Sequence, residues 1–287
     1  MKKVYSTILI SCALFLTVNS TFAQITNKER IVSVGAGITE LLVNLDSSEE
    51  IVALDSTSKR FLSDRKLPIV GYQRNLSAEG IISLKPSILI GSEQMGPDNV
   101  LQKLKQAGIK VEVLQNTTNS ILDLQQHIIK MGEILGKQQV AKQLFEQVQE
   151  VERNIQQTKP TQAIKALFLF IGEKGQLFAG GDDTTANGIL QLINMENRGK
   201  GKKDYYPYSI EALLAQQPKI LFISERSLVQ NLTNILQKNP FLMQLSAVQN
   251  QCVFTIDGQA LLGGFNLTSL RESERLVQLI NQNPKCH

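Results

Sequence analysis

The chain has 287 residues, of which 42% are hydrophobic, enough for one large domain or for two lobes with separate cores. Its 30 basic and 26 acidic residues leave a formal net charge of +4, and cations cluster only in the glycine-containing run at residues 198–204. That run has the composition of an exposed loop, so the sequence does not support a nucleic-acid-binding protein.

The N-terminus has the pattern of a secretory signal. Two lysines, Lys2 and Lys3, precede an apolar run at residues 4–18, and small or polar residues lead to Ala23. We expect a signal peptide at residues 1–23 and export of the mature chain. The segment around Cys12 resembles a lipoprotein processing box, but the apolar run continues beyond it. A soluble exported form is therefore preferred to a lipid-anchored one.

Short apolar runs then alternate with helical patterns. Predicted strands lie at residues 31–34, 51–54, 69–70, 88–90 and 111–114, with helical patterns at 41–45, 78–84 and 98–107. Such alternation is typical of a parallel α/β arrangement. Residues 120–157 differ, because two amphipathic helical patterns follow one another there, the second long enough to reach about 30 Å. Strands are predicted again at residues 166–171, 220–223 and 253–256.

The two halves of the chain resemble each other. The segment from Ser77 to Glu93 matches the segment from Ser209 to Glu225 at a constant offset of 132 residues, including its serine, glutamate and proline positions. We expect an α/β protein of two Rossmann-like lobes with parallel sheets, joined by a long linker helix. The predicted parts are an N-terminal lobe at 24–118, a linker region at 119–160 and a C-terminal lobe at 161–287. The natural ligand site would be the cleft between the lobes.

The sequence offers no convincing catalytic centre, and we expect no enzyme. Of the two histidines, His127 is expected on a solvated helix face, and His287 is terminal. A glycine pair at Gly35 and Gly37 follows a strand, but the third position of a dinucleotide fingerprint is Glu40. Cys252 and Cys286 remain after signal removal, and the sequence leaves open whether they form a disulfide.

A binding site is better supported, by Tyr72 and Arg74. On an extended segment these alternate residues would point the same way, into the cleft. A tyrosinate is a hard oxygen donor suited to ferric iron, and tyrosine is a known haem ligand. The arginine would favour the phenolate or pair with ligand carboxylates.

The string VGYQRNLSAEGIISLKP, with VGAGITELL and LLGGFNLTS, closely resembles the periplasmic haem-binding proteins of bacterial haem ABC importers. The resemblance implies a monomeric periplasmic carrier that binds ferric haem, the transported ligand, with Tyr72 on the iron. It also implies Arg74 and Arg226 as haem-binding partners. Glu79 and Glu211 would dock to arginines of the inner-membrane permease, and an outer-membrane haem receptor would act upstream.

Related proteins carry corrinoids or ferric siderophores, which are the alternative ligands on the same fold. A secreted enzyme on this scaffold is a more distant alternative. Tyr205 and Tyr206 lie near the counterpart of Tyr72 under the 132-residue offset, with either a ligand-covering or a packing role.

Overall fold

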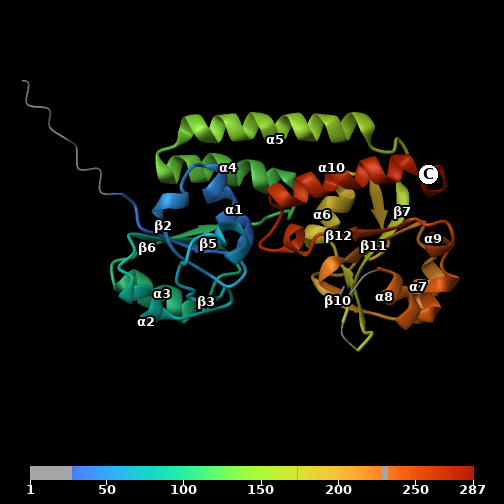
Figure 1. Cartoon of the computed structure of the whole chain (residues 1–287), viewed down its shortest axis with the longest axis horizontal. Coiled ribbons are helices and arrows are strands. Elements are labelled where there is room, and N and C mark those ends of the chain that lie inside the picture. The colour runs from blue at the N-terminus through green and yellow to red at the C-terminus, as the bar shows by residue number, and fades with distance from the viewer. Residues whose placement is uncertain (1–27, 173, 228–231) are drawn as a thin grey trace, which may run out of the picture.

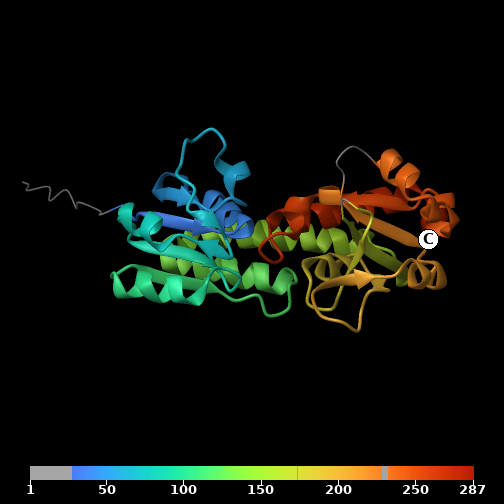
Figure 2. The same ribbon diagram turned by 90° about the horizontal axis from the view of Figure 1, so that it is seen from below.

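The computed structural model describes residues 28–172, 174–227 and 232–287. The predicted signal peptide, with Cys12, lies outside this range. Two lobes lie side by side along the long axis, and the long helix α5 (Gln138–Thr158) runs along one side of both (Figure 1). The view turned by 90° shows the same separation of the two lobes (Figure 2). The α/β fold class predicted from the sequence is confirmed.

The first sheet is entirely parallel, in the order β2-β1-β5-β6. Every residue of β1 (Ile31–Val34) and β5 (Ile88–Ser92) is buried, as expected for strands whose two faces are both covered. The other strands are β2 (Ile51–Leu54) and β6 (Lys110–Leu114), and the helices are α1 (Ala36–Asn44), α2 (Ala78–Ser83) and α3 (Asp98–Gln106). The strand expected at residues 69–70 is reduced to one bridge between Leu54 and Ile69.

The second sheet is mixed, with the order β10-β8-β7-β11-β12 and β9 also paired to β7. Its strands are β7 (Ile164–Ile171), β8 (Leu177–Gly180), β9 (Met195–Asn197), β10 (Tyr205–Tyr208), β11 (Ile220–Ser224) and β12 (Val253–Ile256). Strands β8 and β10 run antiparallel to their neighbours. The connection at 172–176 is too short for the crossover that parallel strands need, so β7 and β8 pair as an antiparallel hairpin. The sequence predicted a parallel sheet in this lobe, and the observed sheet is mixed instead.

The internal repeat is visible in the geometry as well as in the sequence. Ser77 and Ser209 each cap a short helix, α2 and α7 (Ile210–Gln216), by accepting a hydrogen bond from the backbone N–H three residues on. Lys85 and Gln217, also 132 residues apart, share a left-handed backbone with φ of 48° and 39° just before a proline. Two copies of one supersecondary unit therefore build the two lobes.

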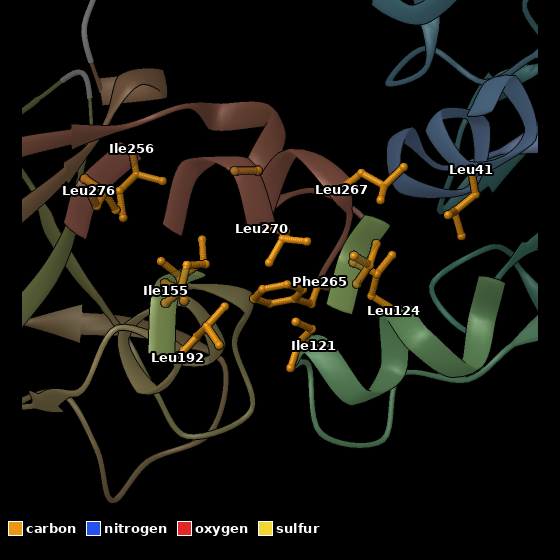
Figure 3. Close-up of a cluster of buried hydrophobic side chains, with 14 of the residues drawn as sticks. Leu41, Ile121, Leu124, Ile155, Leu192, Ile256, Phe265, Leu267, Leu270 and Leu276 are labelled. Atoms are coloured by element: carbon orange, nitrogen blue, oxygen red, sulfur yellow. The ribbon is translucent and has the colours of Figure 1, made fainter. Parts of the chain in front are cut away.

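Three helices join the lobes: α4 (Ile121–Leu135), α5 and α10 (Leu267–Gln282). One apolar cluster runs without interruption from Leu41 of α1, through Leu124 and Phe265, to Ile256 of the second sheet (Figure 3). Because this shared core would be exposed if the lobes separated, it favours a small hinge motion over wide opening. The remaining helices are α6 (Thr185–Leu192), α8 (Leu232–Lys238) and α9 (Ser246–Gln249).

Two sequence-based expectations are changed by the structure. His127 is buried within α4, only 6% exposed, with its Nε2 2.9 Å from the carbonyl of Gln115, so the predicted solvated position is wrong. Cys252 and Cys286, left open by the sequence, form a disulfide with a Cα–Cα distance of 5.5 Å. No helix within the described ranges is both long and apolar enough to cross a membrane.

Candidate ligand-binding cleft

Tyr72 is displayed on a small hairpin of β3 (Gly71–Tyr72) and β4 (Asn75–Leu76). Gly71 is required there: its φ is +118°, and an added Cβ would lie 2.4 Å from the carbonyl oxygen of Asn75. Tyr72 is 47% exposed, and its hydroxyl makes no hydrogen bond to another described residue. The hairpin thus exposes a phenol that is free to bind a ligand.

Arg74 lies in the turn of this hairpin, whereas the sequence predicted an extended segment there. Its side chain is nevertheless exposed like that of Tyr72, while Gln73 between them is only 3% exposed. Gln73 anchors the turn, because its amide donates to Gln94 at 3.2 Å and its carbonyl accepts from the Gly96 N–H at 2.9 Å. Tyr72 and Arg74 are thus exposed on either side of a buried glutamine, which the sequence did not indicate, and their predicted orientation into the cleft stays a prediction.

An apolar cavity of about 260 Å³ lies in the second lobe. Aromatic side chains dominate its lining, which consists of Phe168, Phe170, Phe178, Tyr205, Ser224, Arg226 and Leu261. The ring centroids of Phe168 and Tyr205 are 5.8 Å apart at a tilted angle. Such a wall suits a flat apolar ligand, with one cation at its edge. The alternating phenylalanines at 168 and 170 were the signal in the sequence, and they were missed.

The tyrosines of the second lobe differ chemically from Tyr72. Burial of the Tyr205 hydroxyl, opposed by a hydrogen bond with the Ala186 backbone and by the charge of Arg226, raises its pKa to about 12. Tyr205 as a whole is 41% exposed and lines the cavity, while its hydroxyl interacts with the Ala186 backbone and the Thr184 side chain. Tyr206 donates its hydroxyl to the Gly199 carbonyl at 2.8 Å, and burial raises its pKa too. The raised pKa of each phenol disfavours its tyrosinate form.

Arg226 follows β11, in the short turn Glu225–Ser227, and its backbone N–H donates to Ser224 at 3.3 Å. Its aliphatic stem passes directly over Gly258, where an added Cβ would lie 2.3 Å from the arginine Cγ. The absence of a side chain at Gly258 thus sets the path of Arg226. Arg226 lines both the aromatic cavity and a second, polar one.

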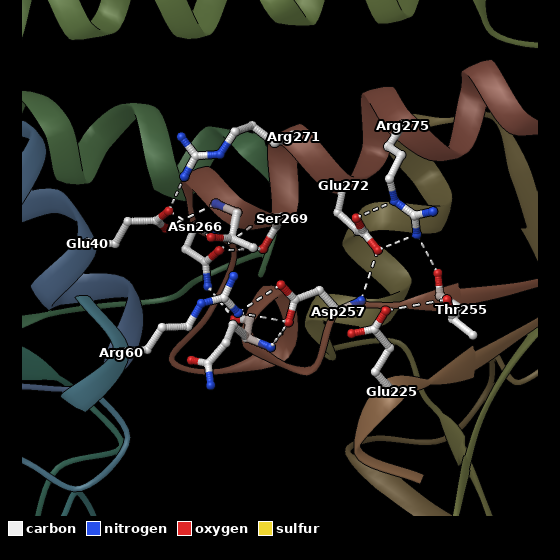
Figure 4. Close-up of polar contacts among 12 residues, drawn as sticks. Glu40, Arg60, Glu225, Thr255, Asp257, Asn266, Ser269, Arg271, Glu272 and Arg275 are labelled. Carbon is white, nitrogen blue, oxygen red and sulfur yellow. Dashed lines mark hydrogen bonds and ion pairs between the residues drawn. The ribbon is translucent and has the colours of Figure 1, made fainter. Parts of the chain in front are cut away.

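The polar cavity, of about 400 Å³, has walls from both lobes and so lies in the interlobe cleft. Thr57 and Arg60 come from the first lobe, and the second lobe supplies Glu225, Arg226, Asp257, Gly258, Gln259 and Leu262. Arg60 crosses to Asp257 at 2.9 Å (Figure 4). The structure therefore brings Arg226 to the cleft beside the apolar wall. Tyr72 and Arg74 line neither of the two cavities.

Glu40, which replaced the third glycine of the dinucleotide pattern, belongs to the lobe junction. It is 1% exposed and accepts hydrogen bonds from the backbone N–H (3.0 Å) and hydroxyl (2.7 Å) of Thr268, with Arg271 as ion-pair partner (Figure 4). Gly37 packs against Asn266, where an added Cβ would lie 3.0 Å from the asparagine Cβ. The segments VGAGITELL and LLGGFNLTS thus meet at one place, and they hold the lobes together.

Glu79 and Glu211 are both exposed, each in the first turn of its short helix. Helices α2 and α7 lie on the side of the molecule away from α5, one in each lobe (Figure 1). A carboxylate in the first turn stabilises its own helix modestly, by about 0.3–1 kcal/mol. The two acids therefore occupy matched positions, one on each lobe.

Comparison with known proteins places the chain in a family. A model for the periplasmic binding protein family matches residues 31–260. The crystal structure of the periplasmic haem-binding protein HutB of Vibrio cholerae is 37% identical, with a TM-score of 0.81, covering 88% of this chain and 99% of that one. A periplasmic haem-binding protein from Pseudomonas aeruginosa is 31% identical, with a TM-score of 0.78, covering 89% and 93%.

Proteins with a different named ligand are also similar. A vitamin B12-binding protein from Photorhabdus laumondii is 26% identical over 78% of this chain and 81% of its own length. The chain belongs to the periplasmic binding protein family, and it is a substrate-binding protein of an ABC transporter, not an enzyme. Proteins of this family deliver their ligand to the transporter permease.

Proposed function

We propose that the protein binds ferric haem in its interlobe cleft and delivers it to an ABC transporter permease. Tyr72 supplies the iron ligand, Arg74 supports it, and Arg226 approaches the ligand from the second lobe. The observation that carries the proposal is the exposed, unbonded phenol of Tyr72 on one lobe, together with an aromatic cavity edged by Arg226 on the other. The names of the two haem-binding neighbours support the same ligand.

The chemistry of the donor set fits iron bound by a single tyrosinate. A phenolate oxygen is a suitable donor for ferric iron, and a single tyrosine can bind the iron of haem. Within the described ranges, no group of three or more His, Cys, Asp and Glu side chains could hold a metal ion. The aromatic wall would cover the macrocycle, and the arginines would meet its carboxylates.

A corrinoid is the second candidate, favoured by the similarity to vitamin B12-binding proteins. Titration of the purified protein with haem and, separately, with cyanocobalamin distinguishes the two. We expect saturable development of a protein-bound ferric haem spectrum and no binding of cyanocobalamin by calorimetry. Cyanocobalamin binding without a haem spectrum would overturn the haem assignment and leave a transport protein for corrinoids.

A further inference from the structure

The polar cavity between the lobes holds a second cation whose position suits an anionic ligand group. Arg60 projects into it from the first lobe, and Arg226 projects into it from the second. Arg226 lines both this cavity and the aromatic cavity. A flat ligand on the aromatic wall would therefore extend its substituents toward the two guanidinium groups.

The hydrogen bonds of Arg60 leave most of its guanidinium free. Its bonds to Asp257 both come from Nη1, at 2.9 and 3.3 Å, and within the described part of the chain Nε and Nη2 donate to no other residue. The side chain is 57% exposed. A guanidinium has five N–H donors in a fixed planar fork, so the unused edge can still take a carboxylate in bidentate geometry.

Asp257 acts as a fixed support for this arginine. Its carboxylate accepts from the Gln259 N–H at 2.8 Å, and its own N–H donates to Glu272 at 2.9 Å. The Nη1 atom of Arg60 is thus held to the second lobe, and Arg60 lines the cavity. Glu225, the other acid of the cavity, has Thr255 at 3.5 Å as a hydrogen-bond partner.

We propose that Arg60 is a specificity-determining residue that binds a carboxylate of the ligand, together with Arg226. This rests on the proposed binding of haem, whose two propionates are carboxylates. Corrinoids carry mainly uncharged amides at their ring edge, so the same cavity selects a carboxylate-bearing tetrapyrrole over an amide-bearing one. The two arginines thus bind the carboxylates at the edge of the ligand, whereas Tyr72 binds its metal.

The test compares haem with haem dimethyl ester, in which both carboxylates are neutral, by spectroscopic titration of the full mature protein. Wild type, Arg60→Gln and the control Lys59→Gln are titrated with both ligands. Lys59 is the exposed neighbour of Arg60 and outside the cavity, so its substitution makes the same charge change. The affinities are also measured at low and high salt, because contacts to an exposed cation are screened.

We expect Arg60→Gln to weaken haem binding about tenfold, a typical loss for one charge-assisted contact, and Lys59→Gln to leave it unchanged. The ester should bind Arg60→Gln and wild type alike, and the salt dependence for haem should be smaller in Arg60→Gln. Equal haem affinity of wild type and Arg60→Gln, or an equal loss for haem and ester, would overturn the role of Arg60. Failure of wild type to bind haem at all would instead refute the proposed function.

Discussion

At the scale of single residues, the phenols of the two lobes lie in different environments. Tyr72 is 47% exposed and its hydroxyl bonds to no other described residue, whereas the hydroxyls of Tyr205 and Tyr206 form hydrogen bonds within the protein. Burial raises the pKa of Tyr205 and of Tyr206, and this opposes the tyrosinate form that binds iron. The environment of each hydroxyl therefore separates the metal-binding candidate from its counterparts in the second lobe.

Alkaline titration tests this difference. We expect the absorbance at 295 nm to show one tyrosine that ionises near pH 12 instead of 10, and this step to vanish in Tyr205→Phe. Because the folded-state pKa lies above the ordinary value, the linked stability is complete below pH 10 and is lost as the pH rises from 10 to 12. A Tyr205 step at pH 10 would show that its hydroxyl is not buried.

Gly258 provides a second test at this scale, because its missing side chain leaves room for the stem of Arg226. In Gly258→Ala the new methyl group would displace Arg226, since its Cβ falls 2.3 Å from the arginine Cγ. We expect haem affinity to fall by a few fold, about as much as in Arg226→Ala, with little change in melting temperature. If Gly258→Ala still weakened binding in an Arg226→Ala background, the effect would not pass through Arg226.

At the scale of elements, the sequence predicted regular units well and irregular ones poorly. The helices and strands of the repeated unit follow from capping serines, apolar spacing and a proline before each strand, and these local signals acted as predicted. The hairpin β3–β4 and the strand β8 were missed because strands of two to four residues carry little periodicity. The turn between β3 and β4 depends instead on contacts such as that of buried Gln73 with Gln94, which is distant in sequence.

The cleft shows the same limit. Tyr72, Arg74 and Arg226 could be proposed from sequence motifs. Of the aromatic wall, only the alternation of Phe168 and Phe170 on one strand was visible, because Phe178 and Leu261 come from separate segments. His127 was misplaced because its hydrogen bond to the Gln115 carbonyl allows a polar ring to be buried. Glu40 likewise gains its partners Thr268 and Arg271 from a segment about 230 residues away.

The disulfide gives a prediction for the C-terminal elements. It connects the residue before β12 to the end of the chain after α10, across a sequence separation of 34. In the chain-entropy account, closing a loop of this length in the unfolded chain stabilises the folded protein by about 3–4 kcal/mol. We expect Cys252→Ser with Cys286→Ser to lower the free energy of unfolding by up to this amount in urea. An unchanged unfolding midpoint, with the wild type confirmed as oxidised, would contradict the pairing.

At the scale of the whole molecule, a continuous core beneath helices α4, α5 and α10 restrains the lobes, and Glu40 ties α1 to the start of α10. The division into lobes at 24–118 and 161–287 with a linker at 119–160 remains our proposal. Helix α10 of the C-terminal lobe packs beside α5 of the linker region. Whether unfolding or limited proteolysis separates α10 from α5 would be the test of that division. Such an architecture favours recognition by a partner that contacts both lobes at once.

The predicted docking of Glu79 and Glu211 to a permease is tested by reversing the charge of both residues. We expect Glu79→Arg with Glu211→Arg to abolish ATP-driven haem uptake into vesicles that contain the cognate permease, because ion pairs across such an interface guide orientation and association. Haem affinity should be unchanged. The control is Glu146→Arg, an exposed acid of α5, the helix that lies on the other side of the molecule from α2 and α7 in Figure 1. Loss of haem affinity in the double variant would place these acids in the ligand site instead.

The most direct test of the whole account is the ferric haem spectrum of Tyr72→Phe, with Tyr208→Phe as the matched control. Removal of one oxygen atom should abolish the tyrosinate-to-iron signature and weaken haem binding by about 100-fold or more, since changes to groups that merely support a metal ligand already cost about 10–100-fold. Tyr208→Phe should match wild type. An unchanged spectrum and affinity in Tyr72→Phe would contradict the assignment of Tyr72 as the iron ligand.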